Sequence, residues 1–173
     1  FEILQGRGSI RYGPHTIGGV INYLTPPLPD KLHLEAEARY GTYGYGMGKL
    51  QVGNRHGAGA YLLHISHTHF DGFRDLNLSM TDALAKFELD LGTAGQLGMK
   101  LNIYNEYSNA TYLGLTTSQF ESDPSLNAAI HDELPLQRYG ANLWHRIALP
   151  HDMMLKSGVY AYLINRDWRR QDV

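Results

Sequence analysis

Cationic and hydrogen-bonding side chains gather near both ends of this sequence. Arg11, His15 and Thr16 share one short turn segment near the start, and Arg166 and Arg169 flank a tryptophan near the end. Arginine makes forked contacts to carboxylates, a suitably held imidazole donates a hydrogen bond, and grouped arginines attract anions. We therefore expect these residues to contact an anionic ligand. The alternatives are that Arg11 only packs its segment against a wall and that the arginines anchor the chain at a membrane interface.

No residue pattern typical of catalysis is found in the sequence. It contains no nucleophile elbow, no H-E-x-x-H and no phosphate-binding loop, and no helical pattern follows Gly6-Arg7-Gly8. His67 and His69 share a face of an expected strand, whereas His64 points the other way, so the pair makes a poor metal site. The sequence predicts that the chain is not an enzyme and carries no metal or cofactor.

The first 25 residues combine two β-type runs with a high density of glycine. Phe1–Leu4 and Val20–Leu24 flank a segment that contains Gly6, Gly8, Gly13, Gly18 and Gly19. Glycine supplies positive φ or lets two backbones approach closely, and a Gly-Pro pair marks a turn. The segment is predicted to be a compact strand–turn–strand unit, small enough to fit inside another structure. The prolines of 26–29 then suit a stiff connector.

Composition favours a charge-poor β protein. The 173 residues carry a formal net charge of −2, 12 tyrosines, 19 glycines, no cysteine and 18% charged residues. A nucleic-acid partner is not expected, because such binders usually show a basic patch. Aromatic girdles, tight turns and a lipid face without ions are what a membrane-spanning barrel needs. Because Phe1 already belongs to the glycine-rich strand–turn–strand unit, we expect the sequence to be an internal fragment of a longer chain.

Apolar and polar residues alternate from Lys31 onward, which predicts antiparallel strands. The expected strands are Leu32–Tyr40, Tyr43–Gly53, Ala58–Phe70, Asn77–Leu91, Gln96–Tyr107, Gln137–Leu149 and Met153–Trp168. Many of them reach the roughly 9–11 residues that cross a bilayer at a tilt. Their connections alternate between tight turns and longer loops, as in outer-membrane barrels, where the tight turns lie on the periplasmic side.

The lysines indicate which strand faces point inward. A lysine on a lipid face costs about 2–4 kcal/mol at the midplane, so Lys86 and Lys100 are expected to face the lumen. Near Lys49 the alternation changes phase, which predicts a β-bulge or bend. The long connection Ser108–Leu136 is expected to be functional or mobile. Helical turns are expected at 118–121 and near 128–131.

The first segment resembles the end of the plug domain of TonB-dependent outer-membrane receptors. That family carries a pattern like I-E-V-x-R-G-x-x-S-x-x-Y-G-x-x-x-x-G-G-x-x-N-x-x-T, which is matched at Glu2, Gly6, Ser9, Tyr12, Gly13, Gly18, Gly19, Asn22 and Thr25. Gly8 lies within the same motif, and R-Y-G-P at residues 11–14 resembles the ferric-citrate type. Gln5 stands where the family usually has an arginine that pairs with barrel carboxylates, and Arg7 or Arg11 are candidates to replace it.

The resemblance implies an all-β fold: about seven strands of a membrane-spanning antiparallel β-barrel, preceded by the C-terminal part of a plug domain. Residues 1–30 would be the plug end and linker, and residues 31–173 the first barrel strands. It also implies import of a ferric chelate, siderophore or citrate-like, across the bacterial outer membrane. Lipid and lipopolysaccharide would surround the barrel. The TonB complex of the inner membrane would act through a segment outside this sequence.

Two other readings remain open at the level of sequence. A porin-like or autotransporter-like barrel, passive or adhesive, would cross the same membrane but would lack the glycine-rich plug segment. A soluble β-sandwich that binds glycans would need a second sheet over the apolar strand faces.

Overall fold

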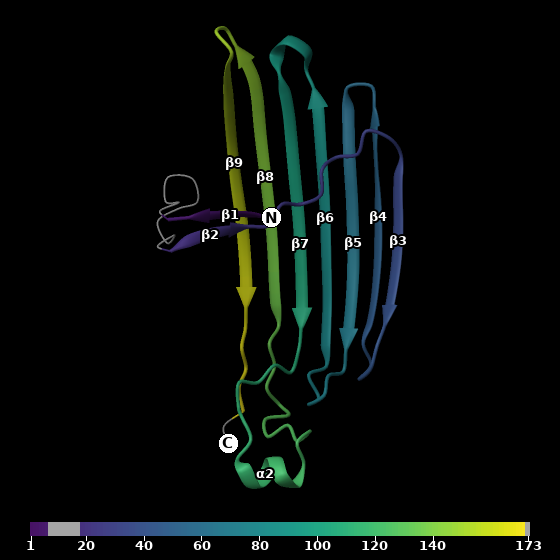
Figure 1. Cartoon of the computed structure of the whole chain (residues 1–173), viewed down its shortest axis with the longest axis vertical. Helices are drawn as coiled ribbons and strands as arrows, with labels where there is room; N and C mark the ends of the chain where they lie inside the picture. Colours follow the sequence, from purple (N-terminus) through teal and green to yellow (C-terminus); the bar gives the residue numbers. More distant parts are fainter. Residues whose placement is uncertain (7–17, 172–173) are drawn as a thin grey trace.

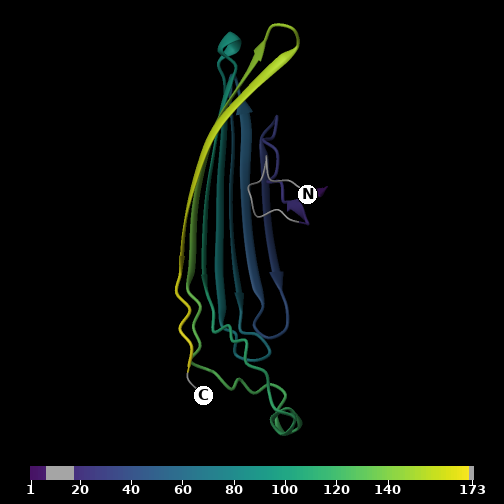
Figure 2. The same cartoon turned by 90° about the vertical axis from the view of Figure 1, so that its left-hand side faces the viewer.

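The segments in which apolar and polar residues alternate form one long, curved antiparallel sheet. The structure is a computed structural model that describes residues 1–6 and 18–171. Its main sheet has seven strands, each paired with its neighbour in the chain (Figures 1 and 2). These strands are β3 (His33–Tyr40), β4 (Gly46–His56), β5 (Gly59–Phe70), β6 (Leu78–Asp90), β7 (Gln96–Tyr107), β8 (Leu136–Leu149) and β9 (Met153–Arg166). The architecture is that of a partial β-barrel wall, as predicted.

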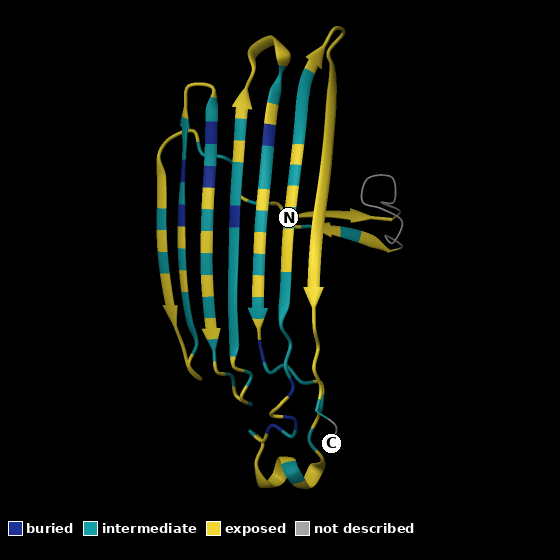
Figure 3. Cartoon of the chain, turned by 180° about the vertical axis from the view of Figure 1, so that it is seen from behind, coloured by how far each residue is buried: buried dark blue, intermediate teal, exposed yellow. Residues whose placement is uncertain are grey.

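Neighbouring rows of residues across this sheet differ in chemistry. One row faces the convex side and is apolar throughout, formed by Leu34, Val52, Leu63, Ala85, Leu101, Ala141 and Ala161. The next row faces the concave side and is mostly polar, formed by Glu35, Gln51, His64, Leu84, Asn102, Gly140 and Tyr162. Exposure follows the same period of two most clearly along β5 and β7, whereas β9 at the edge is exposed along its whole length (Figure 3). Lys86 and Lys100 lie on the polar face, which confirms the predicted register.

No second sheet covers the apolar face in the part of the chain that the structure describes. Leu34 keeps 70% of its surface exposed, and Leu63 keeps 41%. In a soluble sandwich these side chains would meet an opposing layer. The β-sandwich reading therefore lacks the layer that it requires.

Connections of different length lie at opposite ends of the sheet (Figure 1). The turns after β4, β6 and β8 are short. Gly57, in the turn from β4 to β5, takes φ +56°. The 3-10 turn η1 (Gly92–Ala94) joins β6 to β7. Residues 41–45, 71–77 and 108–135 connect strands at the other end. The expected helical turn at 118–121 is confirmed as α2 (Thr117–Ser122), whereas residues 128–131 form a hydrogen-bonded turn instead.

The predicted β-bulge near Lys49 is wrong. Gly46–His56 pairs without interruption with both β3 and β5. Tyr43 and Tyr45 precede the strand and take no part in its alternation. Within the strand, Met47 and Lys49 both face inward, so the alternation keeps its phase without the extra residue of a bulge. The strand also runs three residues further than expected, because the turn to β5 lies at Gly57-Ala58 and not at 54–57.

The glycine-rich segment contributes a small second sheet. β1 (Glu2–Gln5) pairs with β2 (Gly19–Asn22), and the amide of Asn22 donates to Glu2 at 3.1 Å. A side chain at Gly19 would lie 2.7 Å from the carbonyl oxygen of Leu4, so this close pairing needs glycine. The pair lies on the concave side of the main sheet, at mid-height (Figures 1 and 2).

A proline-rich linker joins the two sheets and rests on the concave wall. Lys86 Nζ donates to the carbonyl oxygen of Pro26 at 2.6 Å, and Arg55 Nε donates to Asp30 Oδ1 at 3.2 Å. Gly53 leaves room for the ring of Pro29, and Leu62 beside it is only 1% exposed. Two cations of the wall and one apolar contact therefore hold the linker in place.

Gly98 makes room for Trp144 on the concave face. The two residues are register partners on β7 and β8, and a Cβ at position 98 would overlap the indole ring. By contrast, a Cβ at Gly48 on β4 would meet no atom within 4 Å.

We predict that Gly98→Val destabilises the fold, because the indole must leave its place; overpacking of this kind costs about 1–3 kcal/mol. Denaturant unfolding of the full-length protein in detergent, followed by tryptophan fluorescence, measures the change. Gly48→Val is the matched control and should unfold close to wild type. Equal destabilisation by the two substitutions would contradict the packing role of Gly98.

Candidate anion-binding site on the concave face

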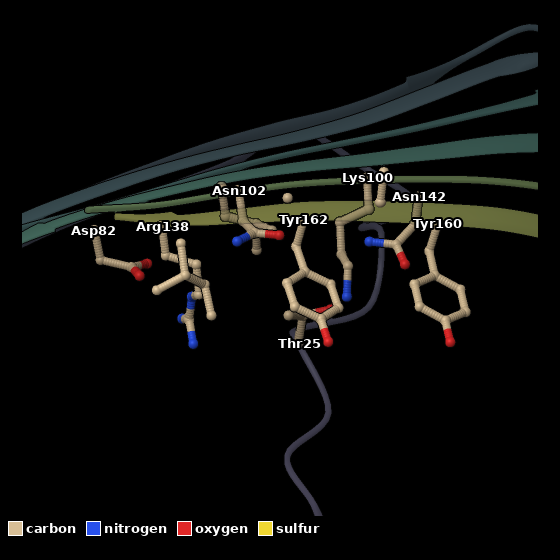
Figure 4. Close-up of a pocket in the computed structure, with 12 residues that line it drawn as sticks. Thr25, Asp82, Lys100, Asn102, Arg138, Asn142, Tyr160 and Tyr162 are labelled. Carbon is tan, nitrogen blue, oxygen red and sulfur yellow. The ribbon is translucent and has the colours of Figure 1, made fainter. Parts of the chain in front are cut away.

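A pocket of about 430 Å³ opens on the concave face beside the linker. Strands β6 to β9 supply its wall, and Thr25 from the linker contributes from the opposite side (Figure 4). Its lining comprises Thr25, Asp82, Leu84, Lys100, Asn102, Arg138, Gly140, Asn142, Tyr160, Ala161, Tyr162 and Ile164. Apart from Leu84, Gly140, Ala161 and Ile164, these side chains carry hydrogen-bonding groups.

Strand register brings the polar side chains of the pocket together. Lys100 pairs with Asn142, which pairs with Tyr160. Asn102 lies opposite Gly140, whose missing side chain leaves space for the Asn102 amide. Figure 4 shows that these side chains, together with Tyr162 and Arg138, point to the same side of the sheet. The arrangement presents ammonium, guanidinium, amide and phenol groups to one volume.

Positive charge in this pocket has no ionic partner among the described residues. Lys86 lies directly opposite Lys100, and like charges in that position repel each other. Neither lysine, nor Arg138, has a carboxylate within 4.0 Å in the part of the chain that is described. Arg138 instead stacks its guanidinium 5.5 Å from the ring centroid of Tyr104. Asp82 is the one acidic residue of the lining, against two cationic ones.

Glu35, Glu37 and Glu88, elsewhere on the concave wall, are paired with basic side chains. Lys49 Nζ lies 2.6 Å from Glu35 and 2.8 Å from Glu37. Glu88 lies 3.8 Å from Arg55 and 3.6 Å from Arg146. These three acids are neutralised locally, whereas Glu106, among the described residues, is bound only by hydroxyl groups, those of Tyr104 and Ser108. Lys86, Lys100 and Arg138 outnumber the carboxylates Asp82 and Glu106 around the β6–β9 pocket, which leaves an excess of positive charge there. Such a site stabilises a bound anion by Coulomb attraction and by charge-assisted hydrogen bonds.

The arginines near the end of the chain form a second cationic group, on the loop side of the pocket. Arg166 ends β9 on the same face as Ile164 of the pocket, about 7 Å nearer the loops. Its guanidinium lies 5.2 Å from the ring centroid of Trp168, and that of Arg170 lies 5.6 Å from it. Arg169 instead forms ion pairs with two carboxylates, that of Asp167 at 2.9 Å and that of Glu133 at 3.1 Å. The Asp167 carboxylate, assisted by Glu133, raises the pKa of Arg169 above its ordinary value.

The long loop between β7 and β8 is tied down at its base by buried residues and hydrogen bonds. Ser108, Ala129 and Asp132 are buried there. The carboxylate of Asp132 accepts a hydrogen bond from the backbone of Gln171 at 2.7 Å, and its carbonyl accepts one from Asn109 at 2.9 Å. These contacts tie the loop to the extension of β9 and so position the arginines around Trp168.

Several residues singled out in the sequence fall elsewhere. Arg11, His15 and Thr16, with the motif residues Gly8, Tyr12 and Gly13, lie outside the described residues. Gly6, Gly18, Gly19 and Asn22 lie at the β1–β2 pair, where Gly6 takes φ +92°. His67 and His69 lie on the convex face, where they contact Thr81 and Asp71 at 2.9 and 2.8 Å.

Sequence reasoning missed the pocket itself. It placed Lys86 and Lys100 on the inward face but treated them only as markers of register. Arg138 received no role, although it follows Gln137 at the start of an alternating run. Its inward position could have been found by continuing the same period of two into that strand.

The fold is similar to a known structure. No protein-family model matches the sequence. The chain superposes on the crystal structure of the ferric citrate transporter FecA in the unliganded form with a TM-score of 0.84 and 19% sequence identity. The match covers 99% of this chain and 27% of that transporter, so the chain spans a minor part of its length. At this identity the likeness shows the fold, a partial β-barrel.

We predict that Asp132→Ala loosens the arginine–tryptophan group, because it leaves the backbone N–H of Gln171 without its acceptor. Loss of one such buried bond costs about 1–3 kcal/mol. Hydrogen–deuterium exchange around residues 166–171 should accelerate in the full-length protein. Asp123→Ala serves as the control, since Asp123 is exposed and, among the described residues, its carboxylate accepts hydrogen bonds only from Ser125 within its own turn. Unchanged exchange in the Asp132 variant would contradict the anchoring role.

Proposed function

We propose that this chain is part of a TonB-dependent receptor of the bacterial outer membrane that imports an anionic ferric chelate. The observation that carries the proposal is the unpaired positive charge of Lys100 and Arg138 in a pocket on the concave wall. A ferric complex of citrate or of a carboxylate siderophore presents the negative oxygens that such a pocket binds. We infer transport without covalent chemistry.

The convex face supports a place in a lipid bilayer. An apolar row crosses all seven strands and keeps its leucines exposed. Hydrocarbon is a favourable environment for such a face, because contact with lipid removes its apolar side chains from water. Among the described residues, no helix is both long and apolar enough to cross a membrane.

Cationic side chains on the concave side support a path for the chelate. Arg166 lies nearest the loops, Arg138 lies two residues further from them along the strands, and Lys100 and Lys86 lie four residues further again. The series ends where Lys86 holds the linker at Pro26. We propose that the chelate first meets Arg11, His15 and Thr16 of the plug together with Arg166, and then the β6–β9 pocket. Arg169, which the sequence also suggested, is neutralised by Asp167 and Glu133 and serves to hold this group in place. The TonB complex would supply the force that moves the plug.

A plugged barrel is favoured over an open or adhesive one. The β1–β2 pair lies on the concave side, and the linker is bound there through Lys86 and Arg55 (Figure 2). A passive pore needs an unobstructed lumen, so an anchored segment on this face supports the receptor reading.

We predict that Leu63→Lys prevents stable insertion, whereas His64→Lys does not. These neighbours on β5 lie on the convex and concave faces respectively. A lysine at the midplane of a lipid face costs about 2–4 kcal/mol, but a lumenal one is hydrated. The test compares the yield of full-length protein in the outer-membrane fraction and its unfolding in phospholipid vesicles. Equal behaviour of the two variants would remove the argument for lipid contact.

We also predict that Lys100→Gln and Arg138→Gln weaken binding of ferric citrate by about tenfold each, because each removes a charge-assisted contact. Binding is measured by titration calorimetry on the full-length protein in detergent, at low and high salt. Lys156→Gln removes the same charge from the same face of β9 outside the pocket and is the matched control. An equal loss in the control, or no loss in the pocket variants, would exclude this pocket from the ligand path.

A further inference from the structure

The strands of the main sheet place no aspartate, glutamate, lysine or arginine on its convex face. Toward the loops, the apolar and aromatic residues of this face give way to one register row of polar residues across β5 to β9. This polar row consists of His67, Thr81, Asn105, Gln137 and Asn165. The apolar band therefore ends, on its loop side, at a line of imidazole, hydroxyl and amide groups.

An apolar groove of about 460 Å³ opens on the same face, over β7, β8 and β9. It is lined by Leu101, Asn102, Ile103, Tyr139, Gly140, Ala141, Ala161, Tyr162 and Leu163. Ala141 and Ala161 are register partners, so two small side chains lie side by side among larger ones. The groove is thus a recess in the lipid-facing wall, and its volume falls within the range of small-molecule sites, about 300–1,000 Å³.

The polar row borders this groove on its loop side. Ile103 and Leu163 line the groove, and Asn105 and Asn165 follow two positions later on the same strands. Two residues along a strand span about 7 Å. Asn105 and Asn165 are exposed, and Gln137 between them is half-buried. One lipid molecule can therefore contact both features, with an acyl chain in the groove and its head group at the amides.

The chemistry of the polar row distinguishes between head groups. A side-chain amide both donates and accepts hydrogen bonds, as does each hydroxyl group of a sugar. A phosphate only accepts, and it gains most from arginine or lysine. Neither of these residues occupies a strand position on the convex face. The row therefore suits an uncharged sugar head group better than a phosphate.

We propose that the groove and the polar row together bind a glycolipid of the outer leaflet. An acyl chain lies over Ala141 and Ala161, and the sugar hydroxyls exchange hydrogen bonds with the amides of Asn105, Gln137 and Asn165. The outer leaflet is assigned because the row lies at the loop end of the sheet, away from the tight turns. The proposal rests on the lipid-facing placement of the convex face proposed above, and it does not depend on the import of a ferric chelate.

The test uses the full-length protein in lauryldimethylamine oxide micelles and two lipids with the same acyl chains, monoglucosyl-dioleoylglycerol and dioleoylphosphatidylglycerol. Titration followed by native mass spectrometry measures the affinity for the first bound lipid. Wild type should bind the glucosyl lipid at least about tenfold more tightly, because only its head group matches several uncharged amides. Equal affinity, or a preference for the phosphate lipid, would overturn the proposal. This comparison needs no substitution and is therefore independent of any folding defect.

Variants then locate the binding. Ala141→Trp fills the groove and should weaken both lipids by about tenfold. Ala36→Trp adds the same bulk to the exposed convex face of β3, outside the groove, and should leave both affinities unchanged. Asn105→Leu should reduce only the preference for the glucosyl lipid, whereas Asn54→Leu, at the opposite end of the convex face, should retain it.

Equal losses in a variant and its matched control would overturn the assigned site. The Leu63→Lys and His64→Lys comparison tests the bilayer placement separately. A difference between those two variants, together with equal binding of the two lipids, would refute the glycolipid site and leave the proposed placement in the membrane intact.

Discussion

The structure depends on the period of two in its strands, which sorts side chains onto two chemically different faces. Every strand of the main sheet hydrogen-bonds its chain neighbour, so the alternation of each strand is in phase with the next. An apolar row therefore runs beside a polar row across the whole sheet. A shift of one residue in any pairing would exchange the faces of that strand and place a lysine such as Lys86 among leucines. That penalty keeps the register unique.

The polar face has its own electrostatic pattern. Toward β3 and β4, each acid finds a nearby cation, as Glu35 and Glu37 do with Lys49. Toward β7 and β8, Lys100 and Arg138 find none among the described residues. The linker crosses between these regions, held by Lys86 and Arg55. The wall is thus neutralised within the β3–β4 region and carries an excess of positive charge at the β6–β9 pocket.

At the loop end, order comes from contacts between segments that are distant in the chain. Arg74 and Leu126 lie 52 positions apart and share a hydrogen bond, and Asp132 holds the backbone of Gln171. These bonds give the loops a fixed base while α2 and its neighbouring aromatic residues stay exposed. A loop built in this way holds the arginines around Trp168 at a fixed place beside the wall.

The sequence by itself determined the strands, their inward and outward faces and the two classes of connection, because these depend on local alternation and on turn residues. It also located α2 and the paired strands of the glycine-rich segment. The predicted β-bulge near Lys49 was wrong. Assigning Tyr43 and Tyr45 to the strand had produced an apparent change in the phase of its apolar–polar alternation. Only the tertiary structure showed that Lys100 and Arg138 meet at one pocket, and that Asp132 ties the long loop to the backbone of Gln171. Those relations depend on register between strands and on loop contacts over long separations, and a pattern within one segment contains neither.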